Sequence, residues 1–342
     1  MTSEILMKAA VLETYGAPFR LAEVARPIAA EVQVLVRVKA ASVSPIDVKI
    51  HAGQAAHARQ TPPAILGVDL AGIVEAVGPR VTGFRRGDEV YGMTGGVGGV
   101  PGALAEFAAV DARLLALKPA NLTLREAAAL PLNLITAWEG LVDRATVHDG
   151  ETVLVQGGAG GVGHIAVQLA RAFGAKVFAT ASAANQDYLA RLGATPIDYR
   201  ETTVEQYVAR HTGGRGFDIV YDTVGGATLD TSFLAVRRFG HVVSCLGWGT
   251  HALAPLSFRA ATYSGVFTLL PLLTGEGREH HGEILREAAT LIEAGKIVPR
   301  LAPARFSLET VDDAYRTFSV GGAAGKIIVD VGGPGAASTA PS

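Results

Sequence analysis

A run of apolar, β-prone residues leads directly into a glycine-dense turn at residues 152–163, which read TVLVQGGAGGVG. A helical pattern follows and ends at Gly174. Strand, glycine turn and helix in this order are the context of a dinucleotide-binding fingerprint. Gly157 allows the tight turn, Gly160 lets the backbone approach a pyrophosphate, and Gly163 lets the helix pack closely on the strand. The stretch therefore predicts a cofactor site, whereas the plainer alternative is a glycine loop between a buried strand and a helix.

Phosphate binding at such a turn uses backbone groups. The first turn of a helix offers unpaired N–H groups and a partial positive charge to an anion. The residues predicted to make these contacts are Ala159, Gly160, Gly161, Val162 and Gly163.

Further strands and helices alternate after the fingerprint. Strands are predicted at residues 176–180, 196–199, 218–222, 241–245 and 265–270, with a helix at 185–192. Alternation of this kind implies parallel βαβ units with both sheet faces covered, and handedness rules then favour a doubly wound sheet. The predicted fold class is α/β, with a Rossmann sheet in the second part of the chain.

The tip of the second strand bears on the choice between NAD and NADP. An Asp or Glu there would bond the ribose 2′-OH of NAD, but residues 180–185 read TASAAN. Ser182, Asn185 and Tyr199 can hydrogen-bond a 2′-phosphate and Arg200 can neutralise it. We therefore predict NADPH as the cofactor, with Thr180, Ser182 and Tyr199 in its site; the alternative is that these polar groups only solvate a loop.

Two more segments follow strands at the edge where open α/β sheets bind ligands. Thr223 and Val224 come after the predicted fourth strand, and Leu246, Gly247 and Trp248 after the fifth. Their backbone groups are predicted to hold the nicotinamide carboxamide. Trp248 either stacks on an aromatic acceptor or anchors the loop by packing.

Composition narrows the function classes. A chain of 342 residues suggests roughly two domains, and a net charge of −2 argues against nucleic acid or an anionic membrane as an obligatory partner. The single cysteine, Cys245, excludes a disulfide framework. The sequence shows neither a membrane-length apolar run nor a secretory signal pattern, so a cytoplasmic location is expected.

The first part of the chain has a different pattern. Short strands and glycine or proline turns fill residues 1 to about 115 and predict an all-β module. Residues 95–102 read GGVGGVPG and predict a flexible loop. Near the other end, residues 326–330 form a strand predicted to return to the module, and a disordered tail is predicted at 333–342.

From residue 7 to residue 331 the chain resembles the medium-chain dehydrogenase/reductase superfamily. The motifs are residues 44–47 (SPID), 67–72 (GVDLAG), 87–90 (GDEV), 157–163 and 325–327 (GKI). The resemblance implies a GroES-like substrate and catalytic domain at 1–128, a Rossmann domain at 129–272 and a return to the catalytic domain at 273–332. It also implies a homodimer formed through the edge of the predicted sixth strand.

The zinc ligands of that superfamily are missing. Its zinc branch has Cys where this chain has Ser44, and His where this chain has Val68. A structural zinc loop needs four cysteines, and a catalytic zinc needs about three ligands plus an open position. The nine histidines form no convincing cluster, so we predict no metal site. Within the superfamily the chain therefore resembles the zinc-independent quinone oxidoreductase branch.

Without a Lewis acid, alcohol oxidation is disfavoured, whereas hydride donation to an electron-poor acceptor needs less help. The hypothesis is NADPH-dependent reduction of a quinone or an α,β-unsaturated carbonyl compound. One alternative is a non-catalytic NADPH-binding protein with a sensor or structural role. Another is an enoyl-thioester reductase, for which His57, Arg59 and residues 85–86 are the only candidates for a basic patch.

The resemblance also supplies candidate site residues. Ser44 and Lys49 flank the turn that faces the nicotinamide in the family, and Thr136 matches a family threonine near the cofactor. Lys326 matches the family's closing motif near the cofactor phosphates. The alternatives are a surface lysine for Lys49, a helix hydroxyl for Thr136 and a linker lysine for Lys326. For Asp47 we favour a structural role, as a cap of the following helical turn.

Overall fold

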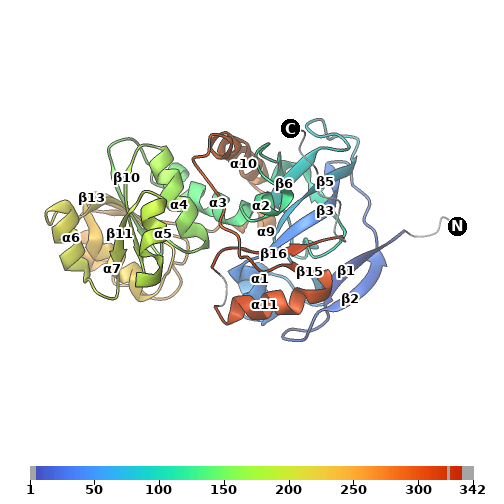
Figure 1. The fold of residues 1–342 in the computed structure, drawn as a ribbon, viewed down its shortest axis with the longest axis horizontal. Coiled ribbons are helices and arrows are strands. Elements are labelled where there is room, and N and C mark those ends of the chain that lie inside the picture. The colour runs from blue at the N-terminus through green and yellow to red at the C-terminus, as the bar shows by residue number, and fades with distance from the viewer. Residues whose placement is uncertain (1–4, 322–323, 333–342) are drawn as a thin grey trace. The chain divides into compact units, whose positions relative to one another are not determined.

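The computed structural model describes residues 5–321 and 324–332, so the tail predicted to be disordered lies outside the described residues. The chain forms two compact units, whose elements are labelled in Figure 1. Of the described residues, the first unit contains 5–132, 269–289, 299–321 and 324–332, and the second contains 133–268 and 290–298. Residues 290–298, which the sequence assigned to the returning segment, thus belong to the second unit.

The first unit is built on two β-sheets. A three-stranded sheet has the order β2-β1-β4, and a larger sheet has the order β15-β16-β3-β5-β6-β8, with β7 paired to β3. The strands are β1 (Leu6–Leu12), β2 (Arg20–Ala25), β3 (Gln33–Val43), β4 (Ala64–Ile65), β5 (Asp69–Val77), β6 (Glu89–Met93), β7 (Phe107–Asp111), β8 (Leu115–Leu117), β15 (Phe306–Ser307) and β16 (Ile327–Asp330). The antiparallel pairing of β16 with β3 confirms that the C-terminal strand returns to the β module.

Helices and short helical turns connect these strands. In the first unit they are α1 (Pro45–His51), η1 (Ala56–Ala58), η2 (Ala112–Leu114), α2 (Leu124–Ala128), α9 (Leu270–Thr274), η5 (Leu308–Thr310) and α11 (Val311–Ser319). Two helices, α3 (Pro131–Trp138) and α10 (Arg278–Glu293), have residues in both units. None of the helices in the described part of the chain is long and apolar enough to cross a membrane.

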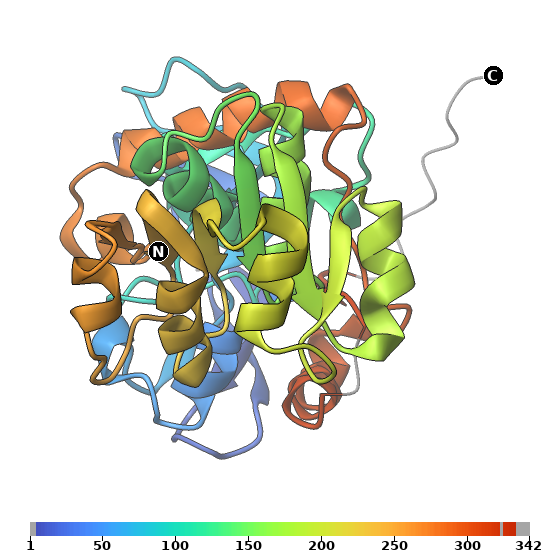
Figure 2. The same cartoon turned by 90° about the vertical axis from the view of Figure 1, so that its left-hand side faces the viewer.

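The second unit is a parallel sheet in the order β11-β10-β9-β12-β13-β14, and Figure 2 shows its strands side by side. This is the strand order of a dinucleotide-binding Rossmann fold, with the switch point between β9 and β12. Its strands are β9 (Thr152–Gln156), β10 (Lys176–Ala181), β11 (Thr195–Asp198), β12 (Phe217–Asp222), β13 (Val236–Ser244) and β14 (Thr262–Gly265). Its helical segments are η3 (Glu139–Arg144), α4 (Gly161–Ala172), η4 (Ala183–Asn185), α5 (Gln186–Arg191), α6 (Val204–Thr212), α7 (Ala227–Ala235) and α8 (Ala254–Ser257).

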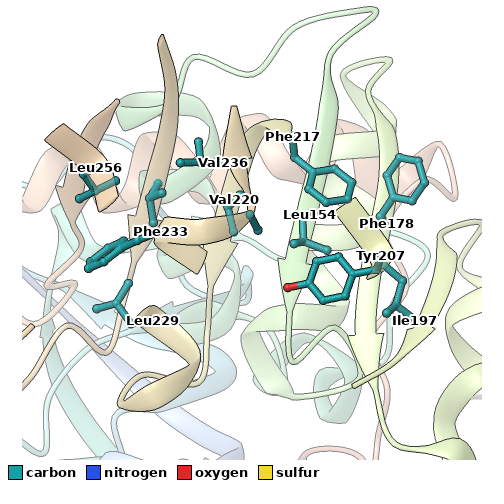
Figure 3. Close-up of a cluster of buried hydrophobic side chains, with 12 residues drawn as sticks. Leu154, Phe178, Ile197, Tyr207, Phe217, Val220, Leu229, Phe233, Val236 and Leu256 are labelled. Atoms are coloured by element: carbon teal, nitrogen blue, oxygen red, sulfur yellow. The ribbon is translucent and has the colours of Figure 1, made fainter. Parts of the chain in front are cut away.

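Apolar side chains from the strands and helices hold this sheet together (Figure 3). Phe178 of β10 and Phe217 of β12 are fully buried, with ring centroids 5.1 Å apart. Phe233 and Leu229 cover the sheet from α7. Burial of each large side chain stabilises the fold by about 1.5–3 kcal/mol, which keeps the carboxyl ends of the strands in fixed register.

Two sequence predictions need correction. The sixth strand ends at Gly265, and the apolar run after it is not strand, since residues 270–274 form α9 with Pro271 in its first turn and Gly275 ending it at φ +85°. Proline favours the start of a helix and glycine its end, and this chemistry overrides the apolar pattern.

The segment 95–102, predicted as flexible, has four of its eight residues buried and is held by the hydrogen bonds Gly96 N–Val100 O and Gly98 N–Ala58 O.

Candidate active site

The glycine turn between β9 and α4 has the geometry that the fingerprint predicts. Gly157 has φ +72°, a conformation that side chains disfavour. A Cβ on Gly163 would lie 2.2 Å from the carbonyl oxygen of Gly157, so only glycine fits there. The first residues of α4, Gly161 and Val162, are exposed and half-buried. The first turn of α4 can therefore receive an anion.

Polar side chains beneath the turn fix its shape. The Thr180 hydroxyl accepts a hydrogen bond from Gly157 N (3.0 Å) and donates one to Gln156 Oε1 (2.8 Å). The Thr223 hydroxyl donates to the carbonyl of Gln156 (2.7 Å). Both threonines were predicted to bind the cofactor, and the structure gives their hydroxyls partners within the protein. Gln156, which the sequence analysis did not select, links them.

Asp222, which the sequence analysis did not select either, fixes the backbone at the carboxyl edge of the sheet. Strand register places Gln156, Asp222 and Ser244 beside one another on β9, β12 and β13. The fully buried carboxylate of Asp222 accepts hydrogen bonds from Ser244 Oγ (2.7 Å) and Gly225 N (3.0 Å). It thereby fixes the loop that contains Thr223 and Val224.

The loops after β12 and β13 expose several predicted cofactor residues. Val224 and Trp248 are each about half exposed, at 49% and 52%, Gly247 is exposed and Leu246 is half-buried. The Trp248 ring packs edge-to-face on Phe267, with centroids 5.8 Å apart. Trp248 is thus anchored by an aromatic neighbour and still presents surface to a ligand.

The predicted 2′-phosphate region lies at the ends of β10 and β11. Ser182 follows β10 and is half-buried, while Tyr199 is 53% exposed. The guanidinium of the exposed Arg200 lies 5.7 Å from the centroid of the Tyr199 ring. One cation and two hydroxyl groups therefore lie at these strand ends, and the cation and the Tyr199 side chain are exposed.

Thr136 belongs to a hydrogen-bonded chain of the second unit. Its hydroxyl lies 3.1 Å from that of Thr268, which donates to Glu139 Oε2 at 2.8 Å. Because the one proton of Thr268 goes to the carboxylate, Thr136 is the donor to Thr268. The main-chain carbonyl of Thr136 also accepts a hydrogen bond from the buried Tyr221 hydroxyl (2.6 Å).

The first unit contains a buried polar cluster around Lys326, formed by Ser42, Ser44, Asp47, Asp69 and Lys326. The Lys326 Nζ donates to Ser44 Oγ at 2.5 Å and lies 3.4 Å from Asp69 Oδ2. Asp69 also accepts from Ser42 Oγ (2.8 Å) and from Leu132 N (2.9 Å). Asp47 Oδ2 accepts from Ser44 N at 2.8 Å, which confirms the capping role predicted for it.

Burial perturbs both carboxyl groups of the Lys326 cluster. Desolvation raises the pKa of Asp47 to about 7, with the nearby Asp69 charge adding to the rise and the Ser44 N–H opposing it. Desolvation also raises the pKa of Asp69, against the attraction of Lys326 and its other hydrogen bonds. The two buried carboxyl groups of the cluster therefore compete for ionisation near neutral pH.

The predicted site residues of the first unit have different surroundings. Ser44 and Lys326 meet inside the Lys326 cluster, with Ser44 fully buried and Lys326 8% exposed. Lys49 lies exposed on α1. Asp69 and Ser42 were not selected from the sequence. Asp69 is a carboxylate at the start of a strand, and the sequence gives no sign of the cation that faces it.

The Lys326 cluster does not fit a zinc ion. Zinc is held by about three nitrogen, sulfur or carboxylate donors. Ser44 offers a hydroxyl, Val68 offers no donor, and the Lys326 ammonium lies within 3.4 Å of Asp69. No group of three or more His, Cys, Asp or Glu residues in the described ranges 5–321 and 324–332 can hold a metal ion.

The fold agrees with comparisons to known families. Residues 30–120 match the alcohol dehydrogenase GroES-like domain, and residues 161–276 match the family described as zinc-binding dehydrogenase. Together with the relatives below, these matches show that the chain belongs to the medium-chain dehydrogenase/reductase superfamily.

Three curated relatives are oxidoreductases. The chain is 38% identical to a 2-methylene-furan-3-one reductase of Solanum lycopersicum, over 90% of this chain and 74% of the relative. It is 35% identical to the chloroplastic NADPH-dependent alkenal/one oxidoreductase of Arabidopsis thaliana, over 94% and 79%. It is 29% identical to a quinone oxidoreductase of Homo sapiens, over 96% and 99%.

A solved structure is more similar still. An alcohol dehydrogenase superfamily protein from Novosphingobium aromaticivorans is 60% identical, with a TM-score of 0.93, over 95% of this chain and all of that one. The whole described fold is thus that of a known superfamily member.

Proposed function

We propose that the chain is an NADPH-dependent oxidoreductase that reduces α,β-unsaturated carbonyl compounds or quinones without zinc. The observation that carries the proposal is the position of the Lys326 ammonium beside Ser44 and Asp69. A zinc ion bound to these residues would need metal-ligand donors around it, and the cluster holds a cation there instead. The three relatives named above support the enone and quinone substrate class.

NADPH supplies a hydride when it is bound. The first turn of α4 and the loops after β12 and β13 would hold its diphosphate and nicotinamide portions. Ser182, Tyr199 and Arg200 favour the 2′-phosphate, because a cation attracts that group and the strand tip at 180–185 contains no acid to repel it.

The chain's own residues play mostly positioning roles in this proposal. Gln156 and Asp222 shape the glycine turn and the loop that follows β12. Ser44 binds Lys326 and is a positioning residue, whereas Lys49 is the exposed cation proposed to polarise a carbonyl oxygen. The proton that completes the reduction is proposed to come from water.

A spectrophotometric acceptor screen tests the proposal. NADPH and NADH are compared side by side with quinones, α,β-unsaturated ketones and aldehydes, and enoyl-coenzyme A thioesters, with and without a metal chelator. Chelator-insensitive NADPH oxidation by enones or quinones would support the proposal. Binding without turnover would favour a sensor or structural role, and turnover of thioesters alone would favour an enoyl-thioester reductase.

Two further features belong to this proposal. We infer a homodimer, since β14 is the last strand of its sheet in the described residues and Tyr263 on it is 39% exposed. Sedimentation should show a dimer at micromolar concentration, and a monomer would contradict the inference. A cytoplasmic location is proposed because one cysteine cannot form an intramolecular disulfide.

A further inference from the structure

Asn133 places a buried amide against the first turn of α4. Asn133 lies in the first turn of α3 and is only 3% exposed. Its Oδ1 and Nδ2 atoms lie 3.1 and 3.3 Å from the point where a Cβ on Gly161 would stand. The amide therefore borders the start of α4 inside the second unit.

The Nδ2 group of Asn133 lacks a hydrogen-bond acceptor among the described residues. A buried amide donor without a partner is costly, so such groups are almost always paired with protein, water or ligand. The two amide atoms are nearly equidistant from Gly161, so exchanging them would still leave an NH₂ group beside that residue.

The neighbouring backbone indicates what this amide would bind. The N–H groups in the first turn of an α-helix have no intrahelical acceptors, and the helix dipole adds partial positive charge. Helix α4 has 12 residues, and its first residue, Gly161, is exposed and has no side chain. The backbone at this turn is open to a ligand, and the buried, unpaired amide of Asn133 lies directly beside it.

We infer that Asn133 is a further cofactor-binding residue, whose side-chain amide donates a hydrogen bond to a diphosphate oxygen of the dinucleotide. The inference rests on the proposed function, since it needs a dinucleotide at α4. An amide suits this place because it donates to an anion without carrying a charge. A carboxylate of the same size would put a negative charge beside the diphosphate.

Two ligands separate this role from a structural one. NADPH contains the diphosphate, whereas adenosine 2′-monophosphate contains only the 2′-phosphorylated end. The dissociation constants of both ligands are measured by calorimetry for wild type, N133D and N133S. The constant of the weaker ligand is obtained by competition with the stronger one. Gln206→Glu is the matched control, because it adds the same charge to the second unit at an exposed residue whose side-chain oxygen still caps α6.

N133D should weaken NADPH binding about tenfold or more and N133S a few-fold, as expected for loss of a hydrogen bond to a charged group. Binding of adenosine 2′-monophosphate should stay within about twofold in both, and Q206E should bind both ligands like wild type. If N133D folds poorly, N133S still supplies the comparison between the two ligands.

Equal weakening of both ligands, or unchanged NADPH affinity in both Asn133 variants, would overturn the inference and leave the proposed function standing. A wild-type protein that binds neither ligand would overturn both.

Discussion

The Nζ of Lys326 lies 2.5 Å from the Oγ of Ser44, although 282 residues separate the two in sequence. The antiparallel pairing of β16 with β3 brings them together, since β16 begins just after Lys326 and β3 ends just before Ser44. The returning strand therefore delivers a cation into the polar cluster of the first unit. The zinc branch of the superfamily has a cysteine in the place of Ser44, and this chain has a hydroxyl there that binds the cation instead.

The pair formed by Lys326 and Asp69 should be essential to the first unit. Their side chains are 6% and 0% exposed, so removing one partner leaves a buried charge without compensation. We expect Lys326→Met to lower the free energy of unfolding by about 3–5 kcal/mol, measured by urea denaturation. The double variant K326M/D69L should recover part of this loss.

Arg20→Met is the control for this measurement. Arg20 pairs with Glu13 at the surface, with side chains 60% and 42% exposed, and surface pairs contribute about 0–1 kcal/mol. Similar losses for R20M and K326M would contradict the role assigned to the buried pair.

Asp47 should make stability depend on pH in a predictable direction. Its pKa rises from 3.8 to about 7 on burial, so between these values the folded protein keeps a proton that the unfolded chain has lost. This contribution to stability is complete below pH 3.8 and is lost as the pH rises through 7. Asp47→Asn keeps an acceptor for Ser44 N and has no proton to lose.

The unfolding free energies of D47N and wild type are therefore compared from pH 4 to pH 8. The difference should shift in favour of D47N by up to about 4 kcal/mol, at about 1.4 kcal/mol per pKa unit. Asp187→Asn, at an exposed position on α5, controls for loss of a carboxylate. A difference that stays nearly constant from pH 4 to pH 8 would contradict the prediction, because it would show that Asp47 is ionised in the folded protein throughout this range.

Gly163→Ala should weaken cofactor binding or destabilise the second unit. Its Cβ would stand 2.2 Å from the Gly157 carbonyl oxygen, so α4 must move away from the glycine turn. We expect at least about a tenfold loss in NADPH affinity or a loss of about 1–3 kcal/mol in stability, as for overpacked positions. Gly265→Ala is the control, because its added Cβ would meet nothing within 4 Å. Wild-type NADPH affinity and stability in G163A would rule out the assigned packing.

Arg200→Ala should reduce the preference for NADPH over NADH. The ratio of kcat/KM for the two cofactors is expected to fall about five- to tenfold, as for loss of one favourable charge contact. Arg191→Ala is a matched control, since its guanidinium also lies beside a tyrosine ring, 5.9 Å from the centroid of Tyr188. An unchanged ratio in R200A, or an equal fall in R191A, would argue against a 2′-phosphate site at Arg200.

Local sequence chemistry was enough to predict most of the strands and the glycine turn of the second unit. Strand, glycine turn and helix recur at β9 and α4 as expected, because Gly157 and Gly163 satisfy constraints that no other residue can meet. The sixth strand was misplaced since an apolar run has no periodicity that separates strand from buried helix. Pro271 and Gly275 carried the signal that would have corrected it.

The Lys326 cluster was only partly predictable. Asp47 lies three residues after Ser44, so its capping role can be inferred from spacing alone. The contacts of Lys326 with Ser44 and Asp69 depend on the register of β16 against β3, which the sequence of either strand does not specify. Asn133 was overlooked for a similar reason, because an asparagine within an apolar helix does not reveal which glycine it faces.

The most direct test follows the hydride itself in protein freed of metal. The chain is dialysed against a chelator, its metal content is measured, and it is incubated with an α,β-unsaturated ketone and NADPH deuterated at either C4 position. The account predicts a saturated ketone with deuterium at the β-carbon from one of the two labelled forms, at the rate of the untreated protein. Deuterium at the carbonyl carbon, or activity that returns only when zinc is added, would contradict it.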